Sequence, residues 1–380
     1  MSMRFALILA MLMLALGGGA LLYKQHERSQ RASNVDVLGR PLLEGLSAAD
    51  VAAIRIAEPG QILTVARRED RWVVAERGGY PADYAKVRDF VLKAGALKIG
   101  QSEPIAGDDR ERLKLVAPDA AGGKEKGAGG GTLVEFRSAD GKPLASVIVG
   151  AKYFKQVPAN PDRAPGDGRF VMLPADPKTV YVVSDPLTQA SAKSAAWIDT
   201  TGFSAERVKS IAYRGAGGER WKVERQNEAS EWQLEGARPG EKVDVTKPNS
   251  AAYMMGRLAV ADVAPADVPP AKTGLDKPGA TIVTQTFDGL TYTVRLGERA
   301  GDNYYAKVAI EGELVKQRTP DKGEKPEGAA GRDKSFAERA AQLEARLERE
   351  KALAAHTLLI AQSTLDDLLK KRGDLLEQRK

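Results

Sequence analysis

The sequence contains no cysteine and only two histidines among its 380 residues. The absence of cysteine excludes disulfide bonds, thiolate metal sites, cysteine nucleophiles and a lipid attached to a cysteine. His26 and His356 have no second histidine or carboxylate at metal-ligand spacing. The motifs of serine hydrolases and zinc peptidases are missing too. We therefore expect no catalytic residue set, no cofactor and no metal site.

A strong excess of one charge is also missing. The chain has 57 Lys and Arg against 51 Asp and Glu, which gives a net charge of +6. No cluster of basic residues with interleaved aromatic residues is present, so a nucleic-acid partner is not expected. With 43% hydrophobic and 28% charged residues, the composition fits a globular body of two or three domains.

One long uncharged run stands at the N-terminus, from Phe5 to Tyr23. As a helix this run is about 28 Å long, which matches the hydrocarbon core of a bilayer. A cleaved signal peptide ending near Gly18 and Ala20 is the alternative. The apolar run resumes beyond that point and ends at Tyr23 and Lys24, a pair typical of a membrane interface. The sequence thus predicts a retained membrane anchor over residues 1–23 and a linker over 24–45.

The charges beside this run give conflicting signals about orientation. Arg4 precedes it, whereas Lys24, Arg28 and Arg31 follow it. Flanking charge alone would keep the C-terminal body in the cytoplasm, but long C-terminal domains translocate largely regardless of such charges. We expect a single-pass protein of the cell inner membrane with a cytoplasmic N-terminus and its C-terminal body in the periplasm.

An internal duplication organises the remaining chain. Residues 46–56 return in similar form as residues 203–213, and each copy is followed by a short alternating strand pattern and a tryptophan, Trp72 or Trp232. A helical apolar spacing comes next, over 81–97 in the first copy and over 247–261 in the second. Each copy then shows Leu-x-x-Pro and two strand-like runs around Asp-Gly, a frequent hairpin turn.

Both copies close with an apolar run that predicts a strand, Val180–Val183 and Leu358–Ala361, followed by a segment in which we expect a helix. These last segments, 187–198 and 365–376, align at a constant offset of 178. The fold class is therefore expected to be α+β, with tandem duplicated units of antiparallel β-hairpins and packed helices after one N-terminal transmembrane helix. The two repeats are expected over 46–199 and 203–376.

The second repeat carries an insertion at about 311–356. Its first half, Lys316 to Lys334, is charged and contains Gly and Pro, so we expect it to be flexible. Its second half, 335–356, has a narrow apolar seam among many charges, which predicts an amphipathic helix that packs on its own repeat or pairs with a partner. The candidate partner-contact residues are Phe336, Leu343, Leu347, Arg346 and Arg349.

The run from Trp72 through Gly79-Tyr80-Pro81-Ala82-Asp83, with Leu113–Pro118 and Gly274–Pro278, resembles the bacterial domain-of-unknown-function family 4340. Members of this family look like single-span envelope proteins found with ABC-type transporters of the gliding-motility type. The resemblance implies an accessory component whose partners are the membrane and auxiliary subunits of such a transporter. It implies no catalytic residue.

These observations lead to one functional expectation and two alternatives. We expect a non-enzymatic, membrane-anchored extracytoplasmic accessory subunit of an ABC-type transport complex that acts through protein contacts. The first alternative is an envelope enzyme, a glycan hydrolase that uses two carboxylates in a cleft between the repeats. The second is a module that binds a glycan or small molecule in that cleft.

Overall fold

The computed structural model describes residues 37–118, 130–315, 318 and 326–377. The expected anchor over 1–23 lies outside these residues. Among the residues described, no helix combines the length and the apolar character needed to cross a bilayer. By their internal contacts the residues form two compact units, which are described separately below. The first holds residues up to Ala66 and Ala85–Ala192, and the second holds Arg67–Tyr84 and Lys193–Lys380.

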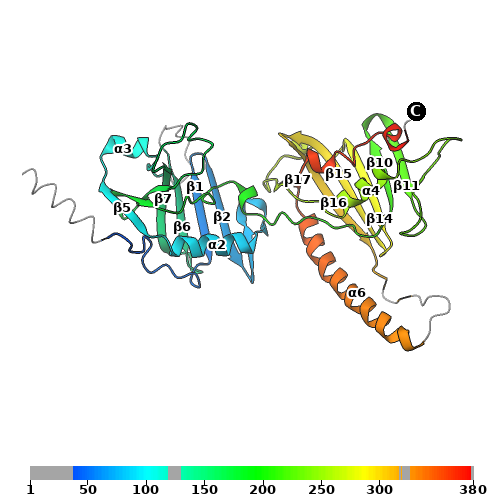
Figure 1. Ribbon diagram of the computed structural model, residues 1–380, viewed down its shortest axis with the longest axis horizontal. Helices are drawn as coiled ribbons and strands as arrows, with labels where there is room; N and C mark the ends of the chain where they lie inside the picture. The colour runs from blue at the N-terminus through cyan, green and yellow to red at the C-terminus, as the bar shows by residue number, and fades with distance from the viewer. Residues whose placement is uncertain (1–36, 119–129, 316–317, 319–325, 378–380) are drawn as a thin grey trace, which may run out of the picture. The chain divides into compact units, whose positions relative to one another are not determined.

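The first sheet is antiparallel and has nine strands in the order β4-β3-β2-β1-β6-β7-β8-β9-β5 (Figure 1). Its strands are β1 (Ala53–Glu58), β2 (Gln61–Arg68), β3 (Arg71–Val74), β4 (Tyr80–Pro81), β5 (Ile99–Pro104), β6 (Thr132–Arg137), β7 (Pro143–Tyr153), β8 (Gly168–Leu173) and β9 (Asp176–Val183). Asp140 and Gly141 lie in the turn between β6 and β7, as expected from the sequence.

Residues alternate between the two faces of the first sheet along each strand, and apolar side chains occur on both faces. Helix α2 (Tyr84–Gly95) covers one face, where Phe90 stacks on Phe136 of β6 with ring centroids 5.9 Å apart. On the other face, Leu115 packs in a cluster with Ile148 of β7 and with residues of the neighbouring strands, namely Met172, Val180 and the partly buried Phe170. The short helix α3 (Gly107–Arg112) and the segment after it lie near this second cluster.

The second sheet is antiparallel with eight strands in the order β12-β11-β10-β14-β15-β16-β17-β13. They are β10 (Val208–Gly215), β11 (Arg220–Glu224), β12 (Gln233–Leu234), β13 (Asp262–Val263), β14 (Ala280–Thr286), β15 (Leu290–Ala300), β16 (Asn303–Gly312) and β17 (Leu358–Ala361). The helices of this unit are α4 (Thr246–Met255), α5 (Pro270–Thr273), α6 (Pro326–Ala354) and α7 (Gln362–Leu365). Single 3₁₀ turns occur at Ala75–Arg77, Ser194–Ala196, Ala216–Gly218 and Arg372–Leu375.

The two sheets follow the same winding. Eight strands of the first sheet can be matched in chain order with those of the second, namely β1, β2, β3, β5, β6, β7, β8 and β9 with β10, β11, β12, β13, β14, β15, β16 and β17. Matched strands then have the same neighbours in the two sheets. The matched strands include both hairpins that the sequence places around Asp-Gly, since Asp288 and Gly289 join β14 to β15. The α+β class with two antiparallel sheets is thus confirmed, and the strand order agrees with a duplicated unit.

The prediction of a helix at the end of each repeat is wrong. In 187–198 the backbone forms only the 3₁₀ turn Ser194–Ala196, and in 365–376 only the end of α7 and the turn Arg372–Leu375. The apolar residues that suggested helices are nevertheless buried: Leu187, Trp197, Ile198, Leu365 and Leu375 are at most 4% exposed. The spacing identified residues of the core and not the backbone geometry that carries them there.

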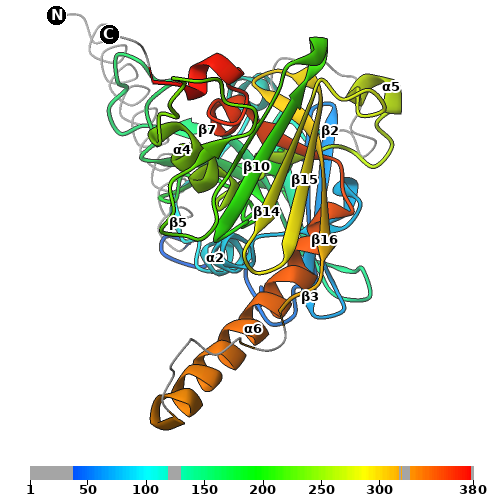
Figure 2. The same cartoon turned by 90° about the vertical axis from the view of Figure 1, so that its right-hand side faces the viewer.

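The end of the half of the insertion expected to be flexible is helical. Helix α6 begins at Pro326 and ends at Ala354, whereas residues 316–317 and 319–325 of that half lie outside the described residues. With 29 residues it is about 44 Å long. Figure 2 shows its C-terminal end beside the second sheet and its N-terminal half extending past the end of the strands.

Candidate functional site

The candidate site is helix α6 together with the surface of the second sheet on which it rests. In the C-terminal half of the helix, Leu343, Leu347, Glu350 and Leu353 are at most 8% exposed. Their spacing of four, three and three residues places them on one face. This face packs toward β16. Residues Ala330–Ser335, by contrast, are all exposed.

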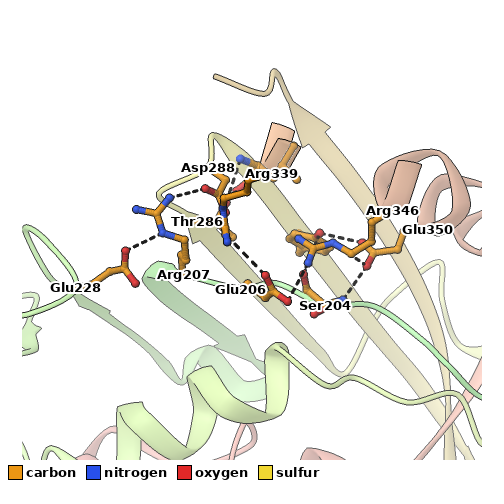
Figure 3. A network of polar contacts seen from close by, with 11 residues as sticks. Ser204, Glu206, Arg207, Glu228, Thr286, Asp288, Arg339, Arg346 and Glu350 are labelled. Carbon is orange, nitrogen blue, oxygen red and sulfur yellow. Dashed lines mark hydrogen bonds and ion pairs between the residues drawn. The ribbon is translucent and has the colours of Figure 1, made fainter. Parts of the chain in front are cut away.

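Glu350 is fully buried and accepts two hydrogen bonds (Figure 3). The backbone N–H of Ser204 donates to its Oε1 at 2.9 Å, and the hydroxyl of Tyr292 donates to its Oε2 at 2.8 Å. The guanidinium of Arg346 lies 3.6 Å from Oε1, and that of Arg349 lies 4.0 Å away. The carboxylate therefore joins α6 to strand β15 and to the chain just before β10.

Asp288 forms a second buried carboxylate site in the hairpin turn between β14 and β15. Its Oδ1 lies 2.6 Å from Nη1 of Arg207, and its Oδ2 lies 3.1 Å from Nη2 of Arg339 on α6. Arg207 also binds Glu228 at 2.7 Å and has a left-handed backbone with φ of 49°. For a residue other than glycine this conformation is strained, so the surrounding contacts must hold it in place.

Glu206 lies between the two carboxylate sites and connects them. Its carboxylate is 3.1 Å from Arg346 and 3.7 Å from Arg339. Four arginines, 207, 339, 346 and 349, thus face four acidic residues, 206, 228, 288 and 350. We call these eight residues the α6 clamp. Opposite charges are matched in number, which suits the attachment of a helix rather than the capture of an ionic ligand.

The five candidate residues occupy different places in this arrangement. Leu343 and Leu347 are buried beneath α6. Arg346 belongs to the α6 clamp, and Arg349 donates in addition to the carbonyl oxygens of Thr201 and Gly202 at 3.4 Å. Phe336 is half-buried over a small crevice of about 50 Å³. The crevice is lined by Arg207, Asp288, Leu314, Val315, Phe336, Arg339, Ala340 and Leu343. The structure thus brings all five together on one helix but directs two of them inward.

Sequence reasoning missed Glu206, Arg207, Glu228, Asp288 and Arg339. Asp288 was recognised only as a turn residue. The sequence nevertheless contains one indication of the clamp, at Glu350. Glu350 interrupts the apolar seam of the helix, and a charged residue on a buried face needs a partner. Arg346 stands four residues before it, on the same side of the helix.

The buried position of Glu350 also affects its protonation. Burial raises the pKa of its carboxyl above the ordinary value, and the hydrogen bonds from Tyr292 and Ser204 and the charges of Arg346 and Arg349 only partly offset this. The folded protein therefore binds the proton more tightly than the unfolded chain. It gains stability as the pH falls through the raised pKa and keeps that gain below the ordinary value of 4.5.

We expect this gain to disappear in a Glu350→Gln variant. The free energy of unfolding of the wild type minus that of Glu350→Gln should increase when the pH is lowered from 7 to 4.5, the ordinary pKa of the carboxyl. Urea unfolding followed by tryptophan fluorescence measures it, since Trp72, Trp197, Trp221 and Trp232 all lie in the second unit. A difference that decreases or stays constant over this range would contradict the assignment.

The comparisons with known proteins identify a family but no activity. No curated protein and no solved structure matches the chain. The family model described as "Domain of unknown function (DUF4340)" matches residues 72–278, which is just over half of the chain. The match runs from β3 in the first sheet to the residues before β14 in the second. The chain therefore belongs to the DUF4340 family.

Proposed function

We propose that this protein is a non-enzymatic accessory subunit of an ABC-type transport complex. It is held in the cell inner membrane by the apolar run Phe5–Tyr23, as a single-pass protein with its C-terminal body in the periplasm. Its partners are the membrane and auxiliary subunits of the transporter. Membership of DUF4340 supports this proposal through the resemblance noted above, and the length of the uncharged run supports the anchor.

Helix α6 is the observation that carries the contact role. From Arg339 to Leu353 it is fixed to the second sheet by the α6 clamp and by Leu343, Leu347 and Leu353. Its N-terminal half extends past the sheet and carries exposed side chains (Figure 2). Because the other end of the helix is already fixed, little conformational entropy is lost when a partner binds these side chains. The partner surface is therefore the outer side of α6 from its N-terminal half to Ala341, where Ala337 and Ala341 are exposed.

Co-purification of the full-length protein from its native membrane in mild detergent tests the proposal. We expect the wild type to bring down transporter subunits, and the double variant Ala337→Arg/Ala341→Arg to recover about tenfold less of them because two long charged side chains disturb a packed helix surface. Alanine and arginine are both good helix formers, so the helix itself should persist.

Ala352→Arg is the matched control. Ala352 is exposed, and it lies 11 residues, or about three turns, beyond Ala341 on the same side of α6. This control should retain its partners. Recovery of the single polypeptide from wild-type membranes would overturn the proposed complex, and equal recovery with the double variant would overturn the role of α6.

A further inference from the structure

The first unit contains a pocket of about 300 Å³ on the face of its sheet that carries α3. Val180 and Val182 of β9 and Phe170 of β8 form its floor, and Ile105 and Leu113 on either side of α3 form its wall. Phe170 and Val180 also belong to the apolar cluster around Leu115. The apolar face of the sheet thus continues beyond α3 and the segment after it, and the pocket lies on this continuation.

Aromatic rings shape one end of the pocket. The ring of Tyr153 on β7 meets Phe170 edge to face, with centroids 5.5 Å apart and an interplanar angle of 82°. Such rings offer faces and edges that pack favourably against a further planar ring. A volume near 300 Å³ with a mostly apolar lining is the lower end of the range for small-ligand pockets.

Two neutral polar groups are held together in the same lining. Gln101 Nε2 donates to the hydroxyl oxygen of Tyr153 at 3.2 Å. Within the described part of the chain, neither the hydroxyl proton of Tyr153 nor Oε1 of Gln101 has a further partner. The pair therefore offers one donor and one acceptor side by side, which a ligand hydroxyl can satisfy because it both accepts and donates.

The charges of the lining favour a neutral ligand. Arg112 is bound to Asp109 at 2.8 Å within α3, so its charge is already compensated. Glu103, exposed on β5, adds a negative charge to the lining. A carboxylate or a phenolate would be repelled there, whereas an un-ionised hydroxyl would not.

We propose that this pocket binds a phenol-like group, a planar apolar ring that carries a neutral hydroxyl. The ring lies on Phe170 and Val182, and the hydroxyl accepts from Tyr153 and donates to Gln101. Such a group can come from a free phenolic compound or from a tyrosine side chain of another polypeptide, and the site recognises the chemistry that the two share. The inference concerns the first unit alone and does not depend on the proposed function of α6.

Fluorine NMR on the full chain provides the test, with 4-fluorophenol, fluorobenzene and 4-fluorobenzoate as probes. We expect 4-fluorophenol to bind with a Kd of about 1 mM or tighter, fluorobenzene about tenfold more weakly, and 4-fluorobenzoate not at all. Absence of 4-fluorophenol binding, or equal binding of fluorobenzene, would overturn the proposal.

Two substitutions locate the site. Tyr153→Phe keeps the ring and removes the hydroxyl, and Gln101→Leu removes the amide at an exposed position where folding is not at risk. Each should weaken 4-fluorophenol about five- to tenfold and leave fluorobenzene unchanged, because one hydrogen bond is lost. Tyr84→Phe, at a tyrosine that is 62% exposed and outside the pocket lining, is the control and should change nothing. Unchanged 4-fluorophenol binding in both pocket variants would place the ligand elsewhere and refute the assignment.

A competition arm distinguishes the two sources of the ligand. Displacement of 4-fluorophenol by a capped Ala-Tyr-Ala peptide would support the proposal with tyrosine of a polypeptide as the ligand. Displacement by p-cresol but not by the peptide would support it with a free phenol. If neither compound displaces the probe, the phenol-like specificity is wrong.

Discussion

A Glu350→Ala variant is expected to lose about 3 kcal/mol of unfolding free energy. Its carboxylate is 0% exposed, and the substitution leaves the partly buried N–H of Ser204 without its acceptor. The hydroxyl of Tyr292 then keeps only the longer bond of 3.3 Å to the carbonyl oxygen of Ser204. An unsatisfied buried polar group costs about 1–3 kcal/mol. The loss of one of the two carboxylates beside Arg346 adds to this, although Glu206 remains 3.1 Å from it, and so does the cavity left by the side chain. Urea unfolding at pH 7 followed by tryptophan fluorescence measures the loss.

Two further variants test whether the loss of stability is specific to the carboxylate of Glu350 or follows from any substitution in α6. Glu348→Ala, two residues away with a side chain that is 74% exposed, should change the free energy by less than about 0.5 kcal/mol. Tyr292→Phe removes one of the two hydrogen bonds and should cost about 1 kcal/mol. If Glu350→Ala were as stable as Glu348→Ala, Glu350 would not fix the helix.

Replacement of Gly297 by alanine should have a similarly large effect, for a steric reason. Gly297 lies in β15, and a Cβ atom there would stand 1.9 Å from the carbonyl oxygen of Thr273. The neighbouring atoms are backbone, so no rotamer change can relieve the clash, and Gly274 already holds a left-handed conformation with φ of 65°. Moving this segment away from the sheet should cost about 3 kcal/mol.

Unfolding of Gly297→Ala in urea measures this cost, and Gly331→Ala is its control. Gly331 lies in the exposed half of α6, and a Cβ atom there would meet nothing within 4 Å. Alanine is the better helix former, so the control should be as stable as the wild type or more stable by up to about 1 kcal/mol. A Gly297→Ala variant with wild-type stability would show that the close approach to Thr273 is not a constraint.

The duplication makes the position of Gly297 recognisable in the amino-acid sequence. Gly150 and Gly297 stand at the ends of equivalent hairpins, and the fold gives them the same surroundings. A Cβ at Gly150 would stand 2.4 Å from the carbonyl oxygen of Leu113, just before Leu-x-x-Pro in the first copy. In both units a turn of backbone crosses the strand at a point where only glycine leaves room.

The segments near the end of each repeat do not form the predicted helices, and the reason is physical. Polar groups in these segments bind elsewhere, in competition with a helical backbone. The hydroxyl of Ser194 donates to Asp262, and the indole N–H of Trp221 donates to the carbonyl oxygen of Lys370. Leu187 has a φ of 47°, which no α-helix accommodates. Apolar spacing in a short segment records burial, and several backbone paths bury the same residues.

The sequence alone determined the α+β class, the hairpins at Asp140 and Asp288 and the existence of the amphipathic helix. These features depend on neighbouring residues, since turn chemistry and periodicity act over a few positions. Only the tertiary structure decided that the seam of α6 lies on its own sheet, that Glu350 fills a buried position in that seam, and that Asp288 pairs with Arg207 and Arg339. Periodicity shows that a helix has an apolar face, but the surface that covers this face comes from segments as distant as Ser204, 146 residues before Glu350.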